Sequence, residues 1–177
     1  MEKAGCTKIA YGIDAINKTT LKKIKPKQKI KLNSFCKALS ITNNSSIIAR
    51  AFIIIGYPWE TKQDLMETKD LIKTLPIDDL RIGVLTPLPG SPIYEEFKKE
   101  RLLLHEDFSK YTTEECVIKL KNITPEELYE IREQIFREFY QSKEYNMRMK
   151  EKIRKYPHLK QSYDEFFEFL DSKGTFK

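Results

Sequence analysis

Two stretches rich in proline and glycine carry residue types that suit ligand binding through the main chain. Residues 56–61 read Gly-Tyr-Pro-Trp-Glu-Thr, and residues 85–94 read Leu-Thr-Pro-Leu-Pro-Gly-Ser-Pro-Ile-Tyr. Prolines fix the direction of the backbone, and glycines let a ligand approach it closely. Taken alone, these residues fit stiff turns between strands and helices equally well, so their composition leaves both interpretations open.

The cysteines and histidines are the other residues that could bind a metal or act as nucleophile or base. Cys6, Cys36 and Cys116 lie far apart and are odd in number, whereas disulfide frameworks and zinc sites use clustered pairs. His105 and His158 have no acid or cysteine at the spacing of metal ligands. We therefore expect reduced, structural thiols and histidines at the surface.

Both stretches follow apolar segments that have the character of strands. The three such segments span residues 9–13, 47–56 and 80–85. The second is nearly continuous in β-branched and aromatic residues, which is typical of a strand covered on both faces and so indicates a parallel sheet. Parallel sheets build binding sites at the carboxyl ends of their strands. The two stretches are thus expected to lie at one rim.

The segments between these strands have the spacing of amphipathic helices. Residues 32–41 place apolar or small side chains on one face, and the two asparagines at positions 43 and 44 suit the end of a helix. Thr61 and Asp64 resemble a capping box at the start of a second helix, which Pro76 closes. Strand, helix, strand, helix, strand over residues 8–86 predicts an α/β protein with right-handed crossovers.

The second half of the chain is predicted to be helical. Residues 124–127 read Thr-Pro-Glu-Glu, a hydroxyl cap followed by proline and acids in the first turn. We expect one helix from there to about Arg154, with an inward face formed by Leu128, Ile131, Ile135 and Phe139. A further short helix is expected over residues 158–171, and its aromatic residues suit a core better than a cofactor site.

The charge of the chain is unevenly distributed. Residues 1–50 carry eleven Lys and Arg against two acids, and the remainder carries twenty-one against twenty-four, within a net charge of +6. The basic stretch from Lys18 to Lys37 could meet the phosphates of RNA, but no aromatic residues interleave with it as stacking platforms would. A solvated helix surface is the favoured interpretation. With no apolar stretch of about 20 residues and no secretory signal, the chain is expected to be cytoplasmic, without membrane contact.

Three motifs in order resemble the radical S-adenosylmethionine superfamily, in particular its cobalamin-associated branch. Residues 5–14 (Gly-Cys-Thr-Lys-Ile-Ala-Tyr-Gly-Ile-Asp) look like the fourth strand of that family's barrel. Residues 52–60 look like the fifth, and residues 85–94 look like the sixth. The resemblance implies an α/β fold: the C-terminal half, three parallel strands with crossover helices, of a (β/α)6 partial TIM-like barrel. It implies strands four to six over residues 1–105 and a C-terminal helical extension over residues 106–177.

The resemblance also implies cofactor-binding roles for single residues. Asp14 holds the place of an acid that contacts the ribose or methionine part of S-adenosylmethionine, although residues 15 and 16 are Ala-Ile where the family has Ser-Gly. Ile54 and Gly56 would flank the adenine, and Glu60 would close the turn. Main-chain groups of Leu85 and Thr86 would meet the adenine edge.

One family element is absent from this sequence. The family holds a 4Fe-4S cluster through a Cys-x3-Cys-x2-Cys loop, and the three cysteines here cannot form one. The resemblance therefore predicts a fragment or subunit of a radical S-adenosylmethionine enzyme, which we do not expect to be active as an isolated chain. It would contribute half of the S-adenosylmethionine pocket, while the cluster ligands and any cobalamin would lie elsewhere.

The expected partner is the missing N-terminal half of the barrel, as a separate chain, or a second copy of this one. Two alternatives stay open: a non-catalytic basic module that binds RNA or an acidic protein, and a decayed remnant. The substrate and the type of reaction are not determined by the sequence.

Overall fold

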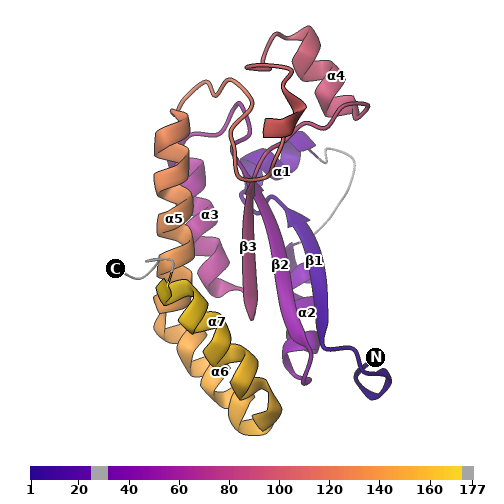
Figure 1. Cartoon of the computed structure of the whole chain (residues 1–177), viewed down its shortest axis with the longest axis vertical. Coiled ribbons are helices and arrows are strands. Elements are labelled where there is room, and N and C mark those ends of the chain that lie inside the picture. Colours follow the sequence, from indigo (N-terminus) through magenta and orange to yellow (C-terminus); the bar gives the residue numbers. More distant parts are fainter. Residues whose placement is uncertain (25–31, 173–177) are drawn as a thin grey trace.

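The computed structural model describes residues 1–24 and 32–172 (Figure 1). Three strands alternate with helices, and a helical region follows. The α-helices and strands are, in chain order, β1 (Lys8–Asp14), α1 (Lys18–Ile24), α2 (Leu32–Asn43), β2 (Ile48–Ile55), α3 (Lys62–Thr74), β3 (Asp79–Val84), α4 (Pro92–Lys99), α5 (Pro125–Gln141), α6 (Lys143–Lys155) and α7 (Lys160–Ser172). Of the basic stretch at residues 18–37, residues 25–31 lie outside the described part.

The three strands form one parallel sheet in the order β1-β2-β3, which confirms the predicted fold class. In the register, Arg50 of β2 lies opposite Ala10 of β1 and Asp79 of β3. The expectation that β2 is covered on both faces is wrong for the described residues. Alternate residues from Ala49 to Ile55 are buried, but on the opposite face Phe52 is 45% exposed.

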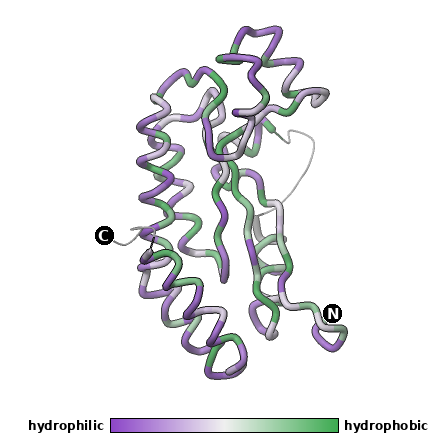
Figure 2. The backbone as a smooth tube through the Cα atoms, viewed as in Figure 1, coloured by the Kyte–Doolittle hydropathy of each residue, from purple (hydrophilic) through white to green (hydrophobic). Residues whose placement is uncertain are grey.

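The hydrophobic core lies on the covered face of the sheet. The crossover helices α2 and α3 line that face, and α5 packs against α3 and β3 (Figure 1). Hydrophobic residues run along β2, and the helices alternate hydrophobic and hydrophilic positions (Figure 2). The expected inward residues of α5, namely Leu128, Ile131, Ile135 and Phe139, are all buried. One hydrophobic cluster holds residues from both sides of position 105, and the predicted domain boundary there stays a prediction.

Both predicted helix starts are confirmed as capping boxes. The Thr61 side chain accepts from the amide of Asp64, and Thr124 accepts from the amide of Glu127, with the acid of each pair accepting in return from the amide of its threonine. Each reciprocal pair satisfies two amides that the helix itself leaves without acceptors. The local sequence therefore sets where α3 and α5 begin.

The single long helix predicted from residue 124 to about 154 is wrong, because the chain breaks at Ser142. This residue has extended backbone angles (φ −64°, ψ 145°), and its hydroxyl accepts from the amide of Tyr145, so it caps a new helix, α6. The same hydroxyl donates to the carbonyl of Phe139 at the end of α5. A serine in a helical pattern can form such local bonds in place of the helix ladder.

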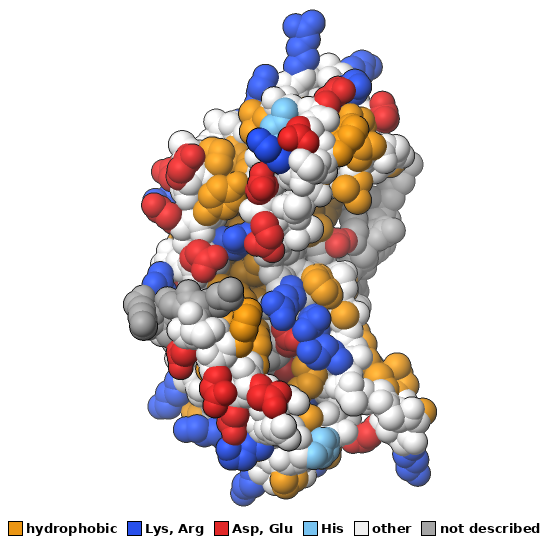
Figure 3. Space-filling view, viewed as in Figure 1, with side chains coloured by type: hydrophobic (Ala, Val, Ile, Leu, Met, Phe, Trp, Pro, Cys, Tyr) orange, Lys and Arg blue, Asp and Glu red, His pale blue; other side chains and the backbone are white. Residues whose placement is uncertain are grey.

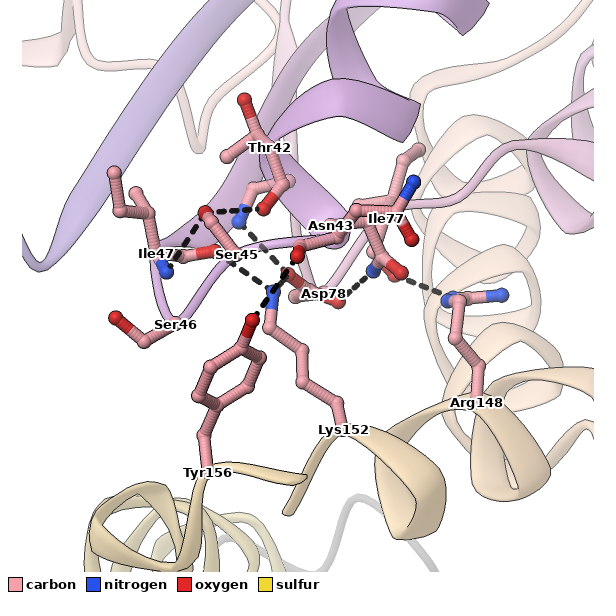
Figure 4. A network of polar contacts seen from close by, with 12 residues as sticks. Thr42, Asn43, Ser45, Ser46, Ile47, Ile77, Asp78, Arg148, Lys152 and Tyr156 are labelled. Atoms are coloured by element: carbon pink, nitrogen blue, oxygen red, sulfur yellow. Dashed lines mark hydrogen bonds and ion pairs between the residues drawn. The ribbon is translucent and has the colours of Figure 1, made fainter. Parts of the chain in front are cut away.

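A buried ion pair fastens α6 to the amino ends of the strands (Figure 4). Lys152 is 4% exposed, and its Nζ donates to Asp78 Oδ2 at 2.5 Å and to the Ile47 carbonyl at 2.7 Å. Asp78 also accepts from the amide of Ala49 and from the Asn43 side chain. Moving a charged group from water into the protein interior costs several kcal/mol, so a buried charge needs hydrogen-bond and ion-pair partners of this kind. The C-terminal helices are thereby held beside the lower end of the sheet.

Among the described residues, no helix combines the length and the apolar character needed to cross a bilayer.

Candidate functional site

The carboxyl ends of the three strands lie side by side at one end of the sheet (Figure 1). β1 ends at Asp14, β2 at Ile55 and β3 at Val84. The turn at residues 56–60 directly follows β2, and the stretch at residues 85–94 directly follows β3. The two proline- and glycine-rich stretches are thus neighbours on a common rim, as the sequence predicted.

Glu60 organises this rim with a fully buried carboxylate. Its Oε2 accepts from the amides of Gly56 at 2.8 Å and Tyr57 at 3.0 Å, so the side chain closes the turn that it ends. Its Oε1 accepts from Asn17 Nδ2 at 3.1 Å and from the Thr20 hydroxyl at 3.0 Å. Burial raises the pKa of Glu60, and these hydrogen bonds act against that shift. Because all four donors come from within the chain, Glu60 positions the turn.

Asn17, in the loop after β1, and Thr20, in α1, tie this part of the chain to the turn after β2, and neither was predicted as a site residue. Besides bonding Glu60, Asn17 donates to the Thr68 hydroxyl of α3 and accepts from the amide of Thr20. The position of an asparagine just before α1 is a helix-start signal that could have been recognised. Its partner Glu60, 43 residues away, could not.

The turn itself presents two aromatic rings held in a stack. The rings of Tyr57 and Trp59 lie 5.3 Å apart with 28° between their planes, and Lys23 of α1 lies 4.8 Å from the Trp59 ring centroid. Burial, with the charges of Asp14 and Glu60, raises the pKa of Tyr57. Gly56 has φ +85°, and a Cβ there would lie 2.8 Å from Leu128. Only glycine fits this position without strain.

Two donors of the rim after β3, the Leu85 amide and the Thr86 hydroxyl, are hydrogen-bonded within the chain. The Leu85 amide donates to the Ile55 carbonyl at 2.8 Å. The single hydrogen of the Thr86 hydroxyl is shared between the carbonyls of Thr112 at 2.8 Å and Val84 at 3.1 Å. These bonds fix the chain direction at the rim. Any contact of Leu85 and Thr86 with a ligand would therefore use other main-chain groups.

Asp14 and Ile54 lie at the rim in different surroundings. Asp14 is half-buried, follows a register shift in β1, and has φ 63°, a left-handed conformation that aspartate adopts more readily than most residues. Ala15 and Ile16 after it belong to the buried core. Ile54 is half-buried on the open face of the sheet, opposite Gly83. The ligand roles predicted for all six rim residues stay predictions.

The cysteines do not come together in the structure. Cys6 precedes β1 rather than lying within it, Cys36 lies in α2, and Cys116 is buried ahead of α5. Burial raises the pKa of the Cys116 thiol, which disfavours the reactive thiolate. His158 is exposed and His105 is half-buried. In residues 1–24 and 32–172, no three His, Cys, Asp or Glu side chains are grouped as a metal site, and a 4Fe-4S cluster does not fit this donor set.

No protein-family model matches the chain. Curated proteins do match it over part of their length. The chain shows distant homology to methyltransferases and methylthiotransferases of the radical S-adenosylmethionine type. The parallel sheet and its strand-end turns agree with that class.

Three relatives illustrate the match. An uncharacterized methyltransferase of Pyrococcus horikoshii is 31% identical over 144 residues, 79% of this chain and 30% of that protein. The bacteriochlorophyllide d C-12(1)-methyltransferase of Chlorobaculum tepidum is 27% identical over 150 residues, 85% of this chain and 32% of that protein. The anaerobic magnesium-protoporphyrin IX monomethyl ester cyclase of Cereibacter sphaeroides is 27% identical over 141 residues, 80% of this chain and 22% of that protein. The chain thus spans about a third or less of the length of these relatives.

Proposed function

We propose that this chain supplies part of the S-adenosylmethionine pocket of a radical S-adenosylmethionine enzyme. The observation that carries the proposal is the shared rim, where the turns after β2 and β3 stand side by side at the carboxyl ends of parallel strands. The distant homology to methyltransferases supports it. S-adenosylmethionine would lie across this rim.

Each predicted site residue would act according to its surroundings. Ile54 would offer an apolar surface to the adenine, and Gly56 would let the base approach the main chain. Asp14 would accept hydrogen bonds from ribose hydroxyls or from the ammonium group. Glu60, whose four hydrogen bonds lie within the chain, would hold the turn in place.

The iron–sulfur cluster that such an enzyme needs would be held outside the residues described here. A polypeptide with the Cys-x3-Cys-x2-Cys loop would complete the barrel by pairing with the outer edge of β1, which pairs with β2 alone among the described strands. The open face of the sheet would then line the interior of the barrel. Cobalamin, where the complete enzyme uses it, would be bound outside this chain as well.

Co-expression tests this proposal. The chain is produced together with a polypeptide from the same genome that carries the three-cysteine loop, and the complex is purified anaerobically. We expect the two to co-purify, to show iron–sulfur absorbance, and to bind S-adenosylmethionine in equilibrium dialysis. Failure to co-purify, or a complex that carries the cluster but does not bind S-adenosylmethionine, would refute the proposal.

A matched pair of substitutions locates the binding. Ile54→Lys places a charge where the adenine would lie, and we expect at least a tenfold loss of S-adenosylmethionine affinity, equal to about 1.4 kcal/mol. Ile41→Lys makes the same change on α2, where the side chain is 65% exposed, and should leave the affinity unchanged. Circular dichroism of both variants checks that the fold is intact. Equal effects of the two substitutions would contradict a site at the rim.

A further inference from the structure

A cavity of about 470 Å³ lies at the opposite end of the sheet from the rim. It is bounded by the amino-terminal halves of the strands on one side and by α6 and α7 on the other. None of its described lining residues belongs to the turns at residues 56–60 or 85–94. Its volume is within the range of small-molecule sites, about 300–1,000 Å³.

Three basic side chains share the face of the sheet that borders this cavity. The register places Arg50 opposite Asp79 and Lys8 opposite Ile48, and side chains two apart in a strand point to the same face. Lys8, Arg50, Asp79 and Arg81 therefore project together. In Figure 3, basic side chains gather at the middle of this face beside hydrophobic ones, above a hollow between the C-terminal helices and the sheet.

Asp79 neutralises only part of this charge. Its Oδ2 accepts from Lys8 Nζ at 2.9 Å and from two nitrogens of Arg50, Nε at 2.7 Å and Nη2 at 2.5 Å. Arg81 Nε lies 3.5 Å from Oδ1. That Oδ1 is buried and has no hydrogen-bond partner. A guanidinium has five N–H donors and an ammonium three, so most donors of this group are not used by Asp79.

The other acids that line the cavity are engaged elsewhere. Asp78 is paired with Lys152, and Glu2 accepts from the amide of Ser46. The facing wall is apolar and aromatic, with Met149 of α6 and Tyr163 and Phe166 of α7. The cavity thus combines an excess of positive charge on the sheet with a hydrophobic wall on the helices.

We propose that this cavity binds a small organic carboxylate with an apolar or aromatic body. The carboxylate would lie against Arg50 and Arg81, since a guanidinium matches its geometry with two parallel hydrogen bonds. The body would pack on Tyr163 and Phe166. This site is separate from the S-adenosylmethionine rim and does not depend on the function proposed above.

Titration calorimetry with 2-naphthoate tests the proposal, with the uncharged 2-naphthamide as its match in shape. We expect the carboxylate to bind at least about tenfold more tightly than the amide, and its affinity to fall as salt is raised, because the attraction is electrostatic. No binding at millimolar concentration, or equal affinity for the two compounds, would overturn the proposal.

Substitutions place the site. Arg81→Gln removes the cation that Asp79 does not hydrogen-bond, and should weaken 2-naphthoate binding about tenfold with little effect on folding. Arg50→Gln should weaken it at least as much. Arg154→Gln, an exposed arginine of α6 outside the cavity, should leave it unchanged. Unaltered binding to Arg81→Gln and Arg50→Gln, or displacement of 2-naphthoate by S-adenosylmethionine, would overturn a separate carboxylate site. If the co-purified complex fails to bind S-adenosylmethionine while 2-naphthoate still binds as expected, only the function proposed for the rim is refuted.

Discussion

At the carboxyl ends of the strands, the Glu60 carboxylate accepts four hydrogen bonds, from the loop after β1, from α1 and from the turn after β2. At the amino ends, Asp79 offers one oxygen to Lys8 and Arg50 and leaves the other without a hydrogen bond. The partners of Glu60 are all neutral donors, and its hydrogen bonds hold the backbone of the turn. Asp79 carries one negative charge beside three cations, so positive charge remains at the cavity. A buried acid whose hydrogen bonds are all satisfied within the chain can position a site. A cluster in which cations exceed acids can bind an anionic ligand.

The largest expected loss of stability concerns the buried ion pair between Lys152 and Asp78 at the amino ends of the strands. Lys152→Met leaves the buried Asp78 without the cation that hydrogen-bonds it, and we expect a loss of about 3–5 kcal/mol in the free energy of unfolding. Adding Asp78→Asn to that variant should recover part of the loss, because the buried charge is then gone. Urea denaturation followed by circular dichroism measures both. Lys150→Met, on the exposed side of α6, is the control. If Lys152→Met lost no more stability than this control, water would have to reach Asp78.

The next prediction compares two glycines of the rim. Gly56 and Gly90 have nearly the same backbone angle, φ +85° and +82°, but a Cβ at Gly56 would lie 2.8 Å from Leu128, and none of the described atoms lies within 4 Å of a Cβ at Gly90. Gly90→Ala should cost about 1–2 kcal/mol for the left-handed conformation. Gly56→Ala should cost about 1–3 kcal/mol more, because it also overpacks the core. Equal losses in thermal or urea unfolding would show that Leu128 moves aside freely.

A smaller loss is expected at the acid of the rim. Glu60→Gln turns one acceptor oxygen into an NH2 group that faces donors, and we expect about 1–3 kcal/mol of destabilisation. In the complete enzyme, affinity for S-adenosylmethionine should fall as well, because the turn at residues 56–60 loosens. Glu67→Gln on the exposed side of α3 is the matched control. Full stability of Glu60→Gln would contradict the positioning role.

The smallest effect belongs to a carboxylate between the two ends. Glu138 of α5 accepts from Lys73 and Lys69 of α3 and from Gln134, and the Lys73 bond above all lowers its pKa to about 2. A folded-state pKa below the unfolded value of about 4.3 means that this stabilisation is present above pH 4.3 and is lost as the pH falls toward 2. Because the group is partly exposed, Glu138→Gln should cost only about 0.5 kcal/mol at pH 7.

Unfolding curves at pH 7 and pH 3 check this prediction. The difference between the wild-type chain and Glu138→Gln should shrink at the lower pH, while Glu130→Gln, an exposed change on the same helix, should show no such trend. A difference that grows at pH 3 would contradict the assigned direction of the pKa shift.

Local signals predicted the elements well, and interactions between distant residues were missed. Thr61 and Thr124 identify helix starts because a cap involves residues three positions apart, and both were predicted correctly. The break at Ser142 was missed because the hydrophobic pattern continues across it and only the capping geometry ends α5. The apolar run of β2 predicted cover on both faces, and that prediction is wrong, because such a run does not show which neighbours will cover it.

The sequence by itself determined the parallel strand–helix order, the helix caps and the rim at residues 56–60 and 85–94, since each depends on side-chain periodicity or on residues a few positions apart. Tertiary structure decided the four partners of Glu60, the pairing of Asp78 with Lys152 across 74 residues, and the joining of Lys8, Arg50 and Arg81 around Asp79. The physical reason is that charge is costly to bury, so its partners are chosen by proximity in the folded chain.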